Sequence, residues 1–211
     1  KDNPNRIEAS AVGDFFDWNY SPSDPTLETR AWYTNAAVVG EPGSPVTFQA
    51  AFRDDHMVFG CVDSLWLMRG DPASGGRIDK VPTNLGVLDS WCGCFDQAGG
   101  LYFLSRAGMA YMPPDGSGAL ALSRAKIPKE LINIDTSKYQ VTMAFDVIRR
   151  GIHIFISEWP EAADTVSVQN LLNWWYDLDA EGFFPDTYYA DVICALWYSS
   201  DWAEQSGVML G

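Results

Sequence analysis

The chain has 211 residues, of which 47% are apolar and 14% aromatic, so it can bury a sizeable core and is not expected to be disordered. Its 14 Lys and Arg residues stand against 28 Asp and Glu residues, which gives a formal net charge of −14. Because nucleic acids and anionic membranes are bound through clustered cations, this composition argues against both as tightly held partners. No stretch reaches the roughly 18 consecutive apolar residues that cross a bilayer.

The first 35 residues are predicted to hold one short strand, over residues 5–10, followed by an ordered loop. In this loop Phe15, Phe16 and Trp18 lie among turn-forming Asp and Asn residues. Large rings in a loop suit packing against a neighbouring surface, so these three side chains are candidate interface residues. The four prolines between residues 22 and 45 disfavour helix there.

A repeat begins at residue 46. Phe52, Phe95 and Phe145 each follow a small residue near the end of a predicted strand, and they are 43 and 50 residues apart. After each of them a short polar turn leads to a second apolar run, which contains Phe59, Phe103 or Phe155. A third short strand follows in each case. Repeats of this length built from short strands are typical of propeller blades.

The predicted fold is therefore all-β: a propeller-like stack of antiparallel β-meander blades with a repeat of about 43–50 residues, in a single domain or part of one over residues 1–211. The units lie near residues 46–80, 87–125 and 140–185, and the six phenylalanines form their repeated core. An insertion from residue 158 to about 169 delays the third strand of the last unit. The alternative is a pair of unrelated β-meanders.

Two further expectations concern the ends of elements and of the chain. One helical turn is predicted at residues 128–132, with Pro128 at its first position. The chain begins with Lys1 rather than Met and stops within an apolar run, so we expect a fragment of a longer polypeptide.

The sequence offers little for nucleophilic catalysis. A Ser or Cys nucleophile needs a base beside it, and only His56 and His153 are available. Both lie in the second strand of a unit, where a buried or rim histidine has a structural role. No phosphate-binding glycine loop, dinucleotide fingerprint or G-x-S-x-G motif occurs. The protein is therefore predicted not to be an enzyme, with no catalytic residue, cofactor or metal.

Acidic residues gather at two places, around Asp54 and between residues 177 and 191. Paired carboxylates can hydrolyse glycosidic bonds, but Asp is also common in hairpin turns, where it bonds to the backbone. Asp177, Asp179 and Glu181 resemble the start of a calcium loop. Tyr188 stands where the closing bidentate Glu belongs, so a solvated turn is favoured over a cation site.

Four cysteines, Cys61, Cys92, Cys94 and Cys194, are expected to be buried free thiols. Two of them are two residues apart, which would strain a disulfide and lacks the spacing of a zinc knuckle.

The C-terminal third is rich in aromatic residues. Trp174, Trp175, Phe183 and Phe184 are candidate interface residues, and they belong to a larger aromatic group that ends at Trp202. Rings at this density more often form a core or a subunit interface than a sugar-stacking surface.

Several short motifs resemble, in order, those of β-propeller-like virion proteins of tailed bacteriophages. The opening resembles the family pattern through Asn5-Arg6-Ile7, Gly13-Asp14 and Asp17-Trp18. The later matching segments are Phe52-Arg53-Asp54, Phe59-Gly60, Ser64-Leu65-Trp66, Arg69-Gly70-Asp71-Pro72, Gly108-Met109, Trp174-Trp175-Tyr176-Asp177 and Gly182-Phe183-Phe184-Pro185. The resemblance covers roughly residues 5–211, and its motifs are structural rather than catalytic.

This resemblance implies a tail nozzle, a tail hub or a portal-proximal plug, made in the host cytoplasm and built into the tail of the virion. The implied partners are copies of the same chain in a ring and other tail or portal-proximal proteins, with DNA only as passing cargo and no membrane. An alternative is a propeller that binds or hydrolyses glycans on the host surface. A cellular scaffold propeller that binds peptides is a third possibility.

Overall fold

The computed structural model describes residues 5–24, 26–27, 29–35, 37, 39–122, 127–159, 173–188, 192–199 and 206–211. Within these ranges the regular structure is almost entirely β-strand, arranged in three four-stranded and two two-stranded antiparallel sheets. The prediction of an all-β fold is confirmed. The predicted insertion after residue 158 lies largely outside the described residues, as do Tyr189 and Trp202.

Each four-stranded sheet is a meander in which consecutive strands are neighbours. Sheet I contains β3 (Val46–Arg53), β4 (His56–Cys61), β5 (Leu65–Arg69) and β6 (Arg77–Lys80). Sheet II contains β7 (Gly93–Phe95), β8 (Leu101–Ser105), β9 (Gly108–Met112) and β10 (Leu120–Ala121). Sheet III contains β11 (Tyr139–Asp146), β12 (Gly151–Glu158), β13 (Asn173–Asp177) and β14 (Gly182–Asp186). The sequence pattern predicted the first three strands of each unit and missed the short fourth strand.

Smaller elements lie at both ends of the described chain and between the sheets. The N-terminal pair is β1 (Glu8–Ala9) with β2 (Trp32–Tyr33), and the C-terminal pair is β15 (Ala195–Tyr198) with β16 (Gly207–Leu210). A 3₁₀ turn (Pro72–Ser74) follows β5. The helical turn predicted over residues 128–132 is present as α1 (Lys129–Ile132), but Pro128 is its N-cap residue and not its first helical residue.

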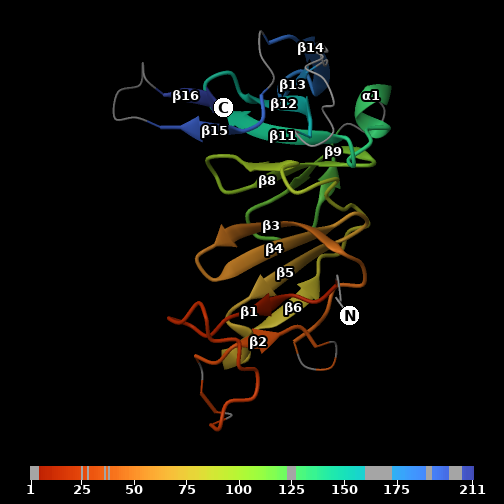
Figure 1. The fold of residues 1–211 in the computed structure, drawn as a ribbon. Coiled ribbons are helices and arrows are strands. Elements are labelled where there is room, and N and C mark those ends of the chain that lie inside the picture. The colour runs from red at the N-terminus through yellow and green to blue at the C-terminus, as the bar shows by residue number, and fades with distance from the viewer. Residues whose placement is uncertain are drawn as a thin grey trace.

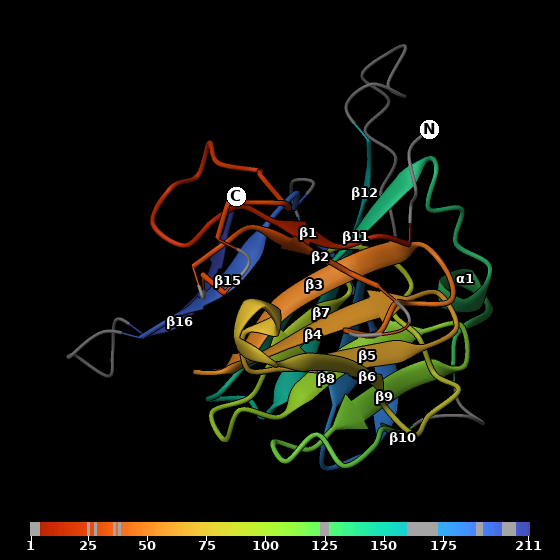
Figure 2. The same ribbon diagram turned by 90° about the horizontal axis from the view of Figure 1, so that it is seen from below.

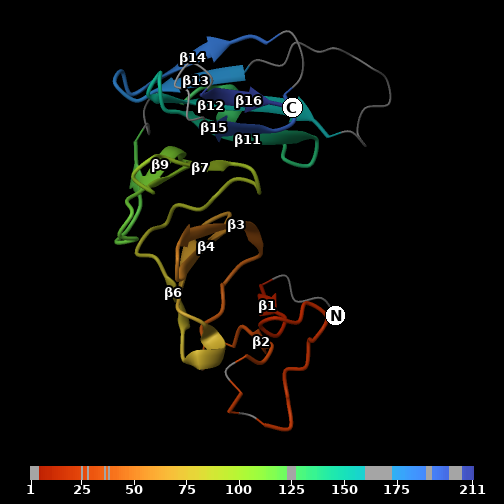
Figure 3. The same ribbon diagram turned by 90° about the vertical axis from the view of Figure 1, so that its left-hand side faces the viewer.

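The three meanders are stacked face to face, with sheet II in the middle (Figure 1). Seen from the side, the N-terminal pair lies beyond sheet I at one end of the stack, and sheet III lies at the other (Figure 3). The C-terminal pair extends sideways from the stack (Figure 2) and contacts β11. The first strands of sheets II and III are also neighbours, because β11 contacts β7.

One large apolar cluster joins all three sheets, which is why the stack holds together. Val58 of sheet I, Leu101 and Met109 of sheet II, and Ile154 of sheet III are each 0% exposed in it. Burial of apolar surface on this scale is the main force that stabilises a β-stack. A second, smaller cluster around Phe59 packs the N-terminal pair against the outer face of sheet I.

Sheet II is buried on both faces because it lies between two other sheets. Phe103 of β8 is paired with Gly93 of β7, so both residues lie on one face of sheet II. A Cβ atom added at Gly93 would lie 2.8 Å from the ring of Phe48, so this face of sheet II meets sheet I. On the opposite face the ring of Tyr102 stacks on Phe145 of sheet III, with centroids 5.8 Å apart. The strands of sheet II consequently carry apolar side chains without the usual alternation.

The repeated phenylalanines occupy similar strand positions but do not all face the same way. Phe52, Phe95 and Phe145 lie at or next to the ends of β3, β7 and β11, the first strands of their sheets. Phe95 and Phe145 both face the preceding sheet, whereas Phe52 faces the following one and lies 6.2 Å from Phe95. Phe52 lies on the same face of β3 as Phe48 and Ala50, as ordinary alternation along the strand requires.

The second set of phenylalanines shows the same inconsistency. Phe59 belongs to the small cluster behind sheet I, and Phe103 faces sheet I from sheet II. Phe155 lies on the outer face of sheet III, where its ring is 5.0 Å from that of Tyr188. The repeat therefore describes the order of the strands and does not describe which face each ring covers.

Candidate functional site

His153 lies at the centre of a buried polar group on the outer face of sheet III. Its Nε2 is 3.4 Å from Asp146 Oδ2 at the end of β11, and its Nδ1 is 2.8 Å from the hydroxyl of Tyr188. The Tyr188 hydroxyl oxygen is 3.0 Å from Asp186 Oδ2. The indole of Trp175 packs against the imidazole, and the guanidinium of Arg149 lies 4.5 Å above that indole.

The Tyr188 hydroxyl has one proton, which goes to Asp186 or to Nδ1 of His153 according to the tautomer of the neutral imidazole. The contact of Nε2 with Asp146 is the longest of the three. Burial lowers the pKa of His153, although the hydrogen bond to Asp146 opposes this, so the neutral ring is favoured. The group is built to hold β12 and the segment after β14 together.

We expect this buried histidine to make the protein less stable in acid. The folded state holds His153 with a pKa below its ordinary value of 6.5, so the unfolded state binds more protons as the pH falls. The stabilisation is complete above 6.5 and is lost as the pH falls toward the folded pKa. Urea unfolding of the wild type and His153→Asn at both ends of this range should show a smaller pH dependence in the variant. His56→Asn is the control. If both variants reduced the pH dependence of the unfolding free energy equally, His153 would not be the source of the acid sensitivity.

In the part of the chain that the structure describes, neither histidine bonds to a Ser or Cys side chain. Among the described residues, His153 bonds only to carboxylate and phenol groups, and His56 contacts the carboxylate of its neighbour Asp55 in the turn after β3. Asp177 accepts hydrogen bonds from the backbone of Asp179 and Ala180, which is the turn role expected for it. These bonds lower the pKa of the Asp177 carboxyl.

The cysteines are more varied than expected. All four are free; Cys61 and Cys92 are buried, but Cys194 is exposed. In the described ranges no cluster of three or more His, Cys, Asp or Glu side chains is arranged to hold a metal ion. No helix in those ranges is long and apolar enough to span a membrane.

The candidate interface aromatics divide into two groups. Phe15, Phe16 and Trp18 are 72%, 86% and 45% exposed in the N-terminal loop. In sheet III, Trp175 is buried, while Trp174 and Phe183 are half-buried against the main core. Phe184 is the exception in this second group, at 48% exposed. The structure therefore places an exposed aromatic surface at the N-terminal end, and most of the C-terminal rings belong to the core.

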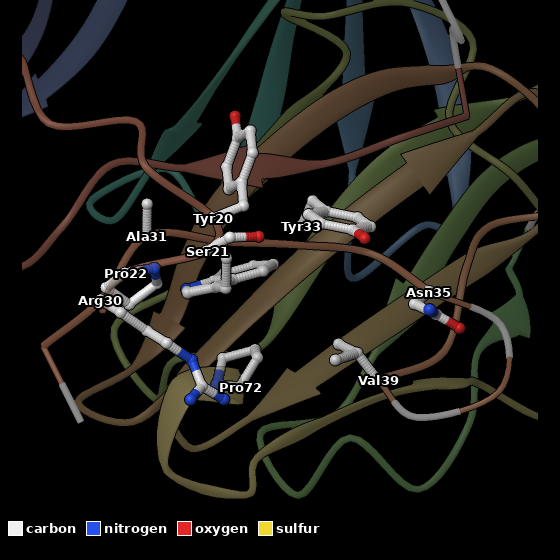
Figure 4. Close-up of a pocket in the computed structure, with 10 residues that line it drawn as sticks. Tyr20, Ser21, Pro22, Arg30, Ala31, Tyr33, Asn35, Val39 and Pro72 are labelled. Carbon is white, nitrogen blue, oxygen red and sulfur yellow. The ribbon is translucent and has the colours of Figure 1, made fainter. Parts of the chain in front are cut away.

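A pocket of about 440 Å³ opens beside the N-terminal pair and is lined by three aromatic residues, Tyr20, Trp32 and Tyr33. Figure 4 shows Tyr20 and Tyr33 on one side and Arg30 with Pro72 on the other. Pro72 is positioned by the 3₁₀ turn, where the N-cap residue Asp71 accepts a hydrogen bond from the backbone N–H of Ala73. We refer to this site as the N-terminal pocket.

Two aromatic walls of the N-terminal pocket are held in place by an ionic group behind them. Arg6 forms an ion pair with Glu8, with Nε 2.6 Å from Oε1, and its guanidinium lies 4.0 Å from the centroid of the Tyr33 ring. The Tyr20 hydroxyl donates to Glu8 at 2.7 Å, and its ring meets that of Tyr33 edge-on at 5.2 Å. Partial burial and this hydrogen bond raise the pKa of Tyr20.

The sequence reasoning did not single out this pocket. The sequence feature that could have indicated the pocket is an arginine two positions before two aromatic residues, within residues 30–33. The other walls of the pocket come from residues 20–22, 35, 39 and 72, which lie outside this four-residue segment. Only the folded arrangement of β2 beside the outer face of sheet I brings them together.

No family model matches the sequence, and no curated protein resembles it significantly. The assignment of a function consequently depends on the features of this structure and on the motifs in its sequence.

Proposed function

We propose that the protein is a non-enzymatic structural component of a bacteriophage tail or neck, which assembles as a ring that helps to retain or conduct DNA. The observation that carries the proposal is the exposed aromatic loop, because Phe15, Phe16 and Trp18 place large apolar surfaces in solvent at one end of the stack. Exposed apolar patches of this kind mark protein–protein contacts. The proposed location in a virion is supported by the short sequence motifs that resemble those of virion proteins.

The stacked meanders support a mechanical role. Three four-stranded sheets of the same strand order share one core, and the adjacency of β7, β11 and β15 is the arrangement expected of blades around a common axis. A stack joined by one core resists bending between its sheets. Rings of such subunits would form a rigid wall.

The proposed role toward DNA follows from charge. A formal net charge of −14 repels phosphate, so DNA would pass without being held. This property suits a conduit and opposes a tight DNA-binding site.

Assembly through the aromatic loop can be tested directly. Replacing Phe15, Phe16 and Trp18 by Ser should leave the fold intact, because these side chains are exposed, and should abolish ring formation. Mass photometry and negative-stain imaging of the purified wild type should show closed rings and those of the triple variant should show monomers. Leu120→Ser, which changes a 67% exposed apolar residue in sheet II, is the control.

Two results would contradict the proposal. One is a wild type that remains monomeric at high concentration; the other is its absence from purified virions of the phage that encodes the chain, as judged by mass spectrometry. Within the C-terminal aromatic group, Trp175 and Tyr176 are buried and cannot stack on a sugar, whereas Phe184 is exposed.

A further inference from the structure

We propose that the surface beside Trp91 binds a neutral oligosaccharide built from flat pyranose units, which stack on the indole. This inference does not depend on assembly or on the location of the protein in a virion. Trp91 is 56% exposed, and it lines two hollows of about 430 and 380 Å³. We refer to these two hollows and the ring that they share as the Trp91 groove.

The size of the Trp91 groove suits more than one sugar unit. Four neighbouring residues of β3 line the larger hollow together with Ser90 and Trp91. The smaller hollow is lined by Trp91 and by residues in and next to β7, β11 and β15. Each volume lies within the range of small-molecule sites, which is roughly 300–1,000 Å³. Because the two hollows share one ring, an extended ligand can occupy both.

The backbone at Trp91 is fixed before a ligand arrives. The carbonyl oxygen of Trp91 accepts a hydrogen bond from Met143 N in β11 at 3.2 Å. The next residue, Cys92, is 0% exposed, and its carbonyl oxygen accepts from Leu104 N in β8 at 2.9 Å. Only the side-chain torsions of Trp91 remain to be ordered, so a ligand that packs on the indole loses little free energy to ordering the site.

The lining of the Trp91 groove favours a neutral ligand. No charged residue occurs among the described residues that line either hollow, although 20% of the residues of the chain are charged. The wall of the larger hollow lies within residues 39–122, which are described without a gap. The neighbouring carboxylate of Asp89 accepts a hydrogen bond from the backbone of Ser90 at 2.8 Å. These walls offer no ion pair to a charged ligand, and a net charge of −14 repels an anion.

The polar groups of the larger hollow suit sugar hydroxyls. Gln49 is exposed, and its amide both donates and accepts hydrogen bonds. The Thr47 hydroxyl donates to backbone carbonyl oxygens, so its oxygen is left to accept. β3 is also an edge strand, paired only with β4 in the described part of the chain, and its other edge carries main-chain donors and acceptors.

A β-linked glucose unit matches this combination of groups. Its two faces carry only C–H groups, which pack on an indole, and its hydroxyls lie around the edge of the ring, where they can bond to the polar lining. A wholly apolar ligand would displace water from those polar groups without replacing its hydrogen bonds. The lining therefore favours a neutral saccharide over an apolar ligand.

A series of defined sugars tests the inference. Saturation-transfer NMR titrations of the whole chain should show that cellotetraose binds about tenfold more tightly than glucose, because only the longer ligand reaches both hollows. Cellobiouronic acid differs from cellobiose by a carboxylate in place of one hydroxymethyl group, and it should bind more weakly than cellobiose. Adenosine, a neutral ligand that also stacks on aromatic rings, should bind more weakly than cellotetraose.

Variants of Trp91 separate stacking on this ring from binding elsewhere. Trp91→Ala should weaken cellotetraose binding about tenfold, and Trp91→Phe, which keeps an aromatic face, should retain part of the affinity. Trp18→Ala is the matched control, because it removes an indole that is 45% exposed in the N-terminal loop, and it should leave the affinity unchanged. Since Trp91 is exposed, the urea midpoint of Trp91→Ala should match that of the wild type.

Four results would overturn the inference. The first is that no sugar of the series receives saturation at millimolar concentration. The second is that cellobiouronic acid binds as tightly as cellobiose, or adenosine as tightly as cellotetraose. The third is wild-type affinity for cellotetraose in folded Trp91→Ala, or in Trp91→Phe if the alanine variant does not fold. The fourth is an equal loss of affinity in Trp18→Ala, which would place the sugar on the N-terminal loop.

Discussion

Phe103→Ala is expected to lower the free energy of unfolding by about 3–5 kcal/mol, among the largest losses for a single substitution in this chain. Phe103 is 0% exposed in β8, the second strand of the central sheet. It faces sheet I, and its neighbours on both sides are strands, so the surrounding backbone cannot collapse into the space left by the ring. The loss combines the transfer free energy of the ring with the cost of the cavity.

The matched control is Phe16→Ala, which removes the same ring from a position that is 86% exposed. We expect a change within about 0.5 kcal/mol, since surface substitutions of this kind alter stability little. Urea unfolding followed by tryptophan fluorescence measures both variants. Similar losses for the two substitutions would show that the exposed loop packs against the protein in solution, and would also undermine the proposed interface.

The class of fold was predictable because its signal is local. Short apolar runs separated by Asp- and Gly-rich turns indicate strands, and their spacing indicated three successive meanders. The fourth strand of sheet II was missed for a physical reason. β10 comprises only Leu120 and Ala121, both exposed, and such an edge strand leaves no alternating apolar pattern to detect.

The repeat did not allow us to predict which face of its sheet each phenylalanine ring covers. The side chains of a strand alternate with period two, so a motif displaced by one residue relative to this alternation points to the other face. Phe52 shares a face of β3 with Phe48 and Ala50 and faces the following sheet, whereas Phe95 and Phe145 face the preceding one. The same sequence motif therefore places its phenylalanine on opposite faces in different sheets.

The candidate sites were less predictable than the fold. The exposed loop of Phe15, Phe16 and Trp18 was identified because rings among turn residues have no strand in which to be buried. Trp175 gave the same compositional signal but is buried, since it alternates onto the face of β13 that meets His153. The N-terminal pocket depends on contacts between distant segments, for which composition gives no signal.

The second large effect is expected at Gly86, in the connection between sheets I and II. A Cβ atom there would lie 2.2 Å from the carbonyl oxygen of Cys61 and 2.4 Å from the backbone nitrogen of Asp63. Both atoms belong to the turn between β4 and β5, so a side-chain rotation cannot relieve the contact. The adjacent hydrogen bond from Val87 N to the same Cys61 oxygen, at 2.8 Å, must lengthen when the connection moves away.

Gly86→Ala should therefore cost about 3 kcal/mol or more, from overpacking together with a weakened buried hydrogen bond. Gly43→Ala is the matched control, because no atom lies within 4 Å of the added methyl group and the backbone needs no left-handed conformation. That variant should be neutral or slightly more stable, since alanine restricts the unfolded chain. Urea unfolding compares the two, and amide exchange should show loss of protection first at Val87. Equal stability of both variants would mean that the connection does not pack against the β4–β5 turn, and the stacking of sheet II on sheet I would then need another explanation.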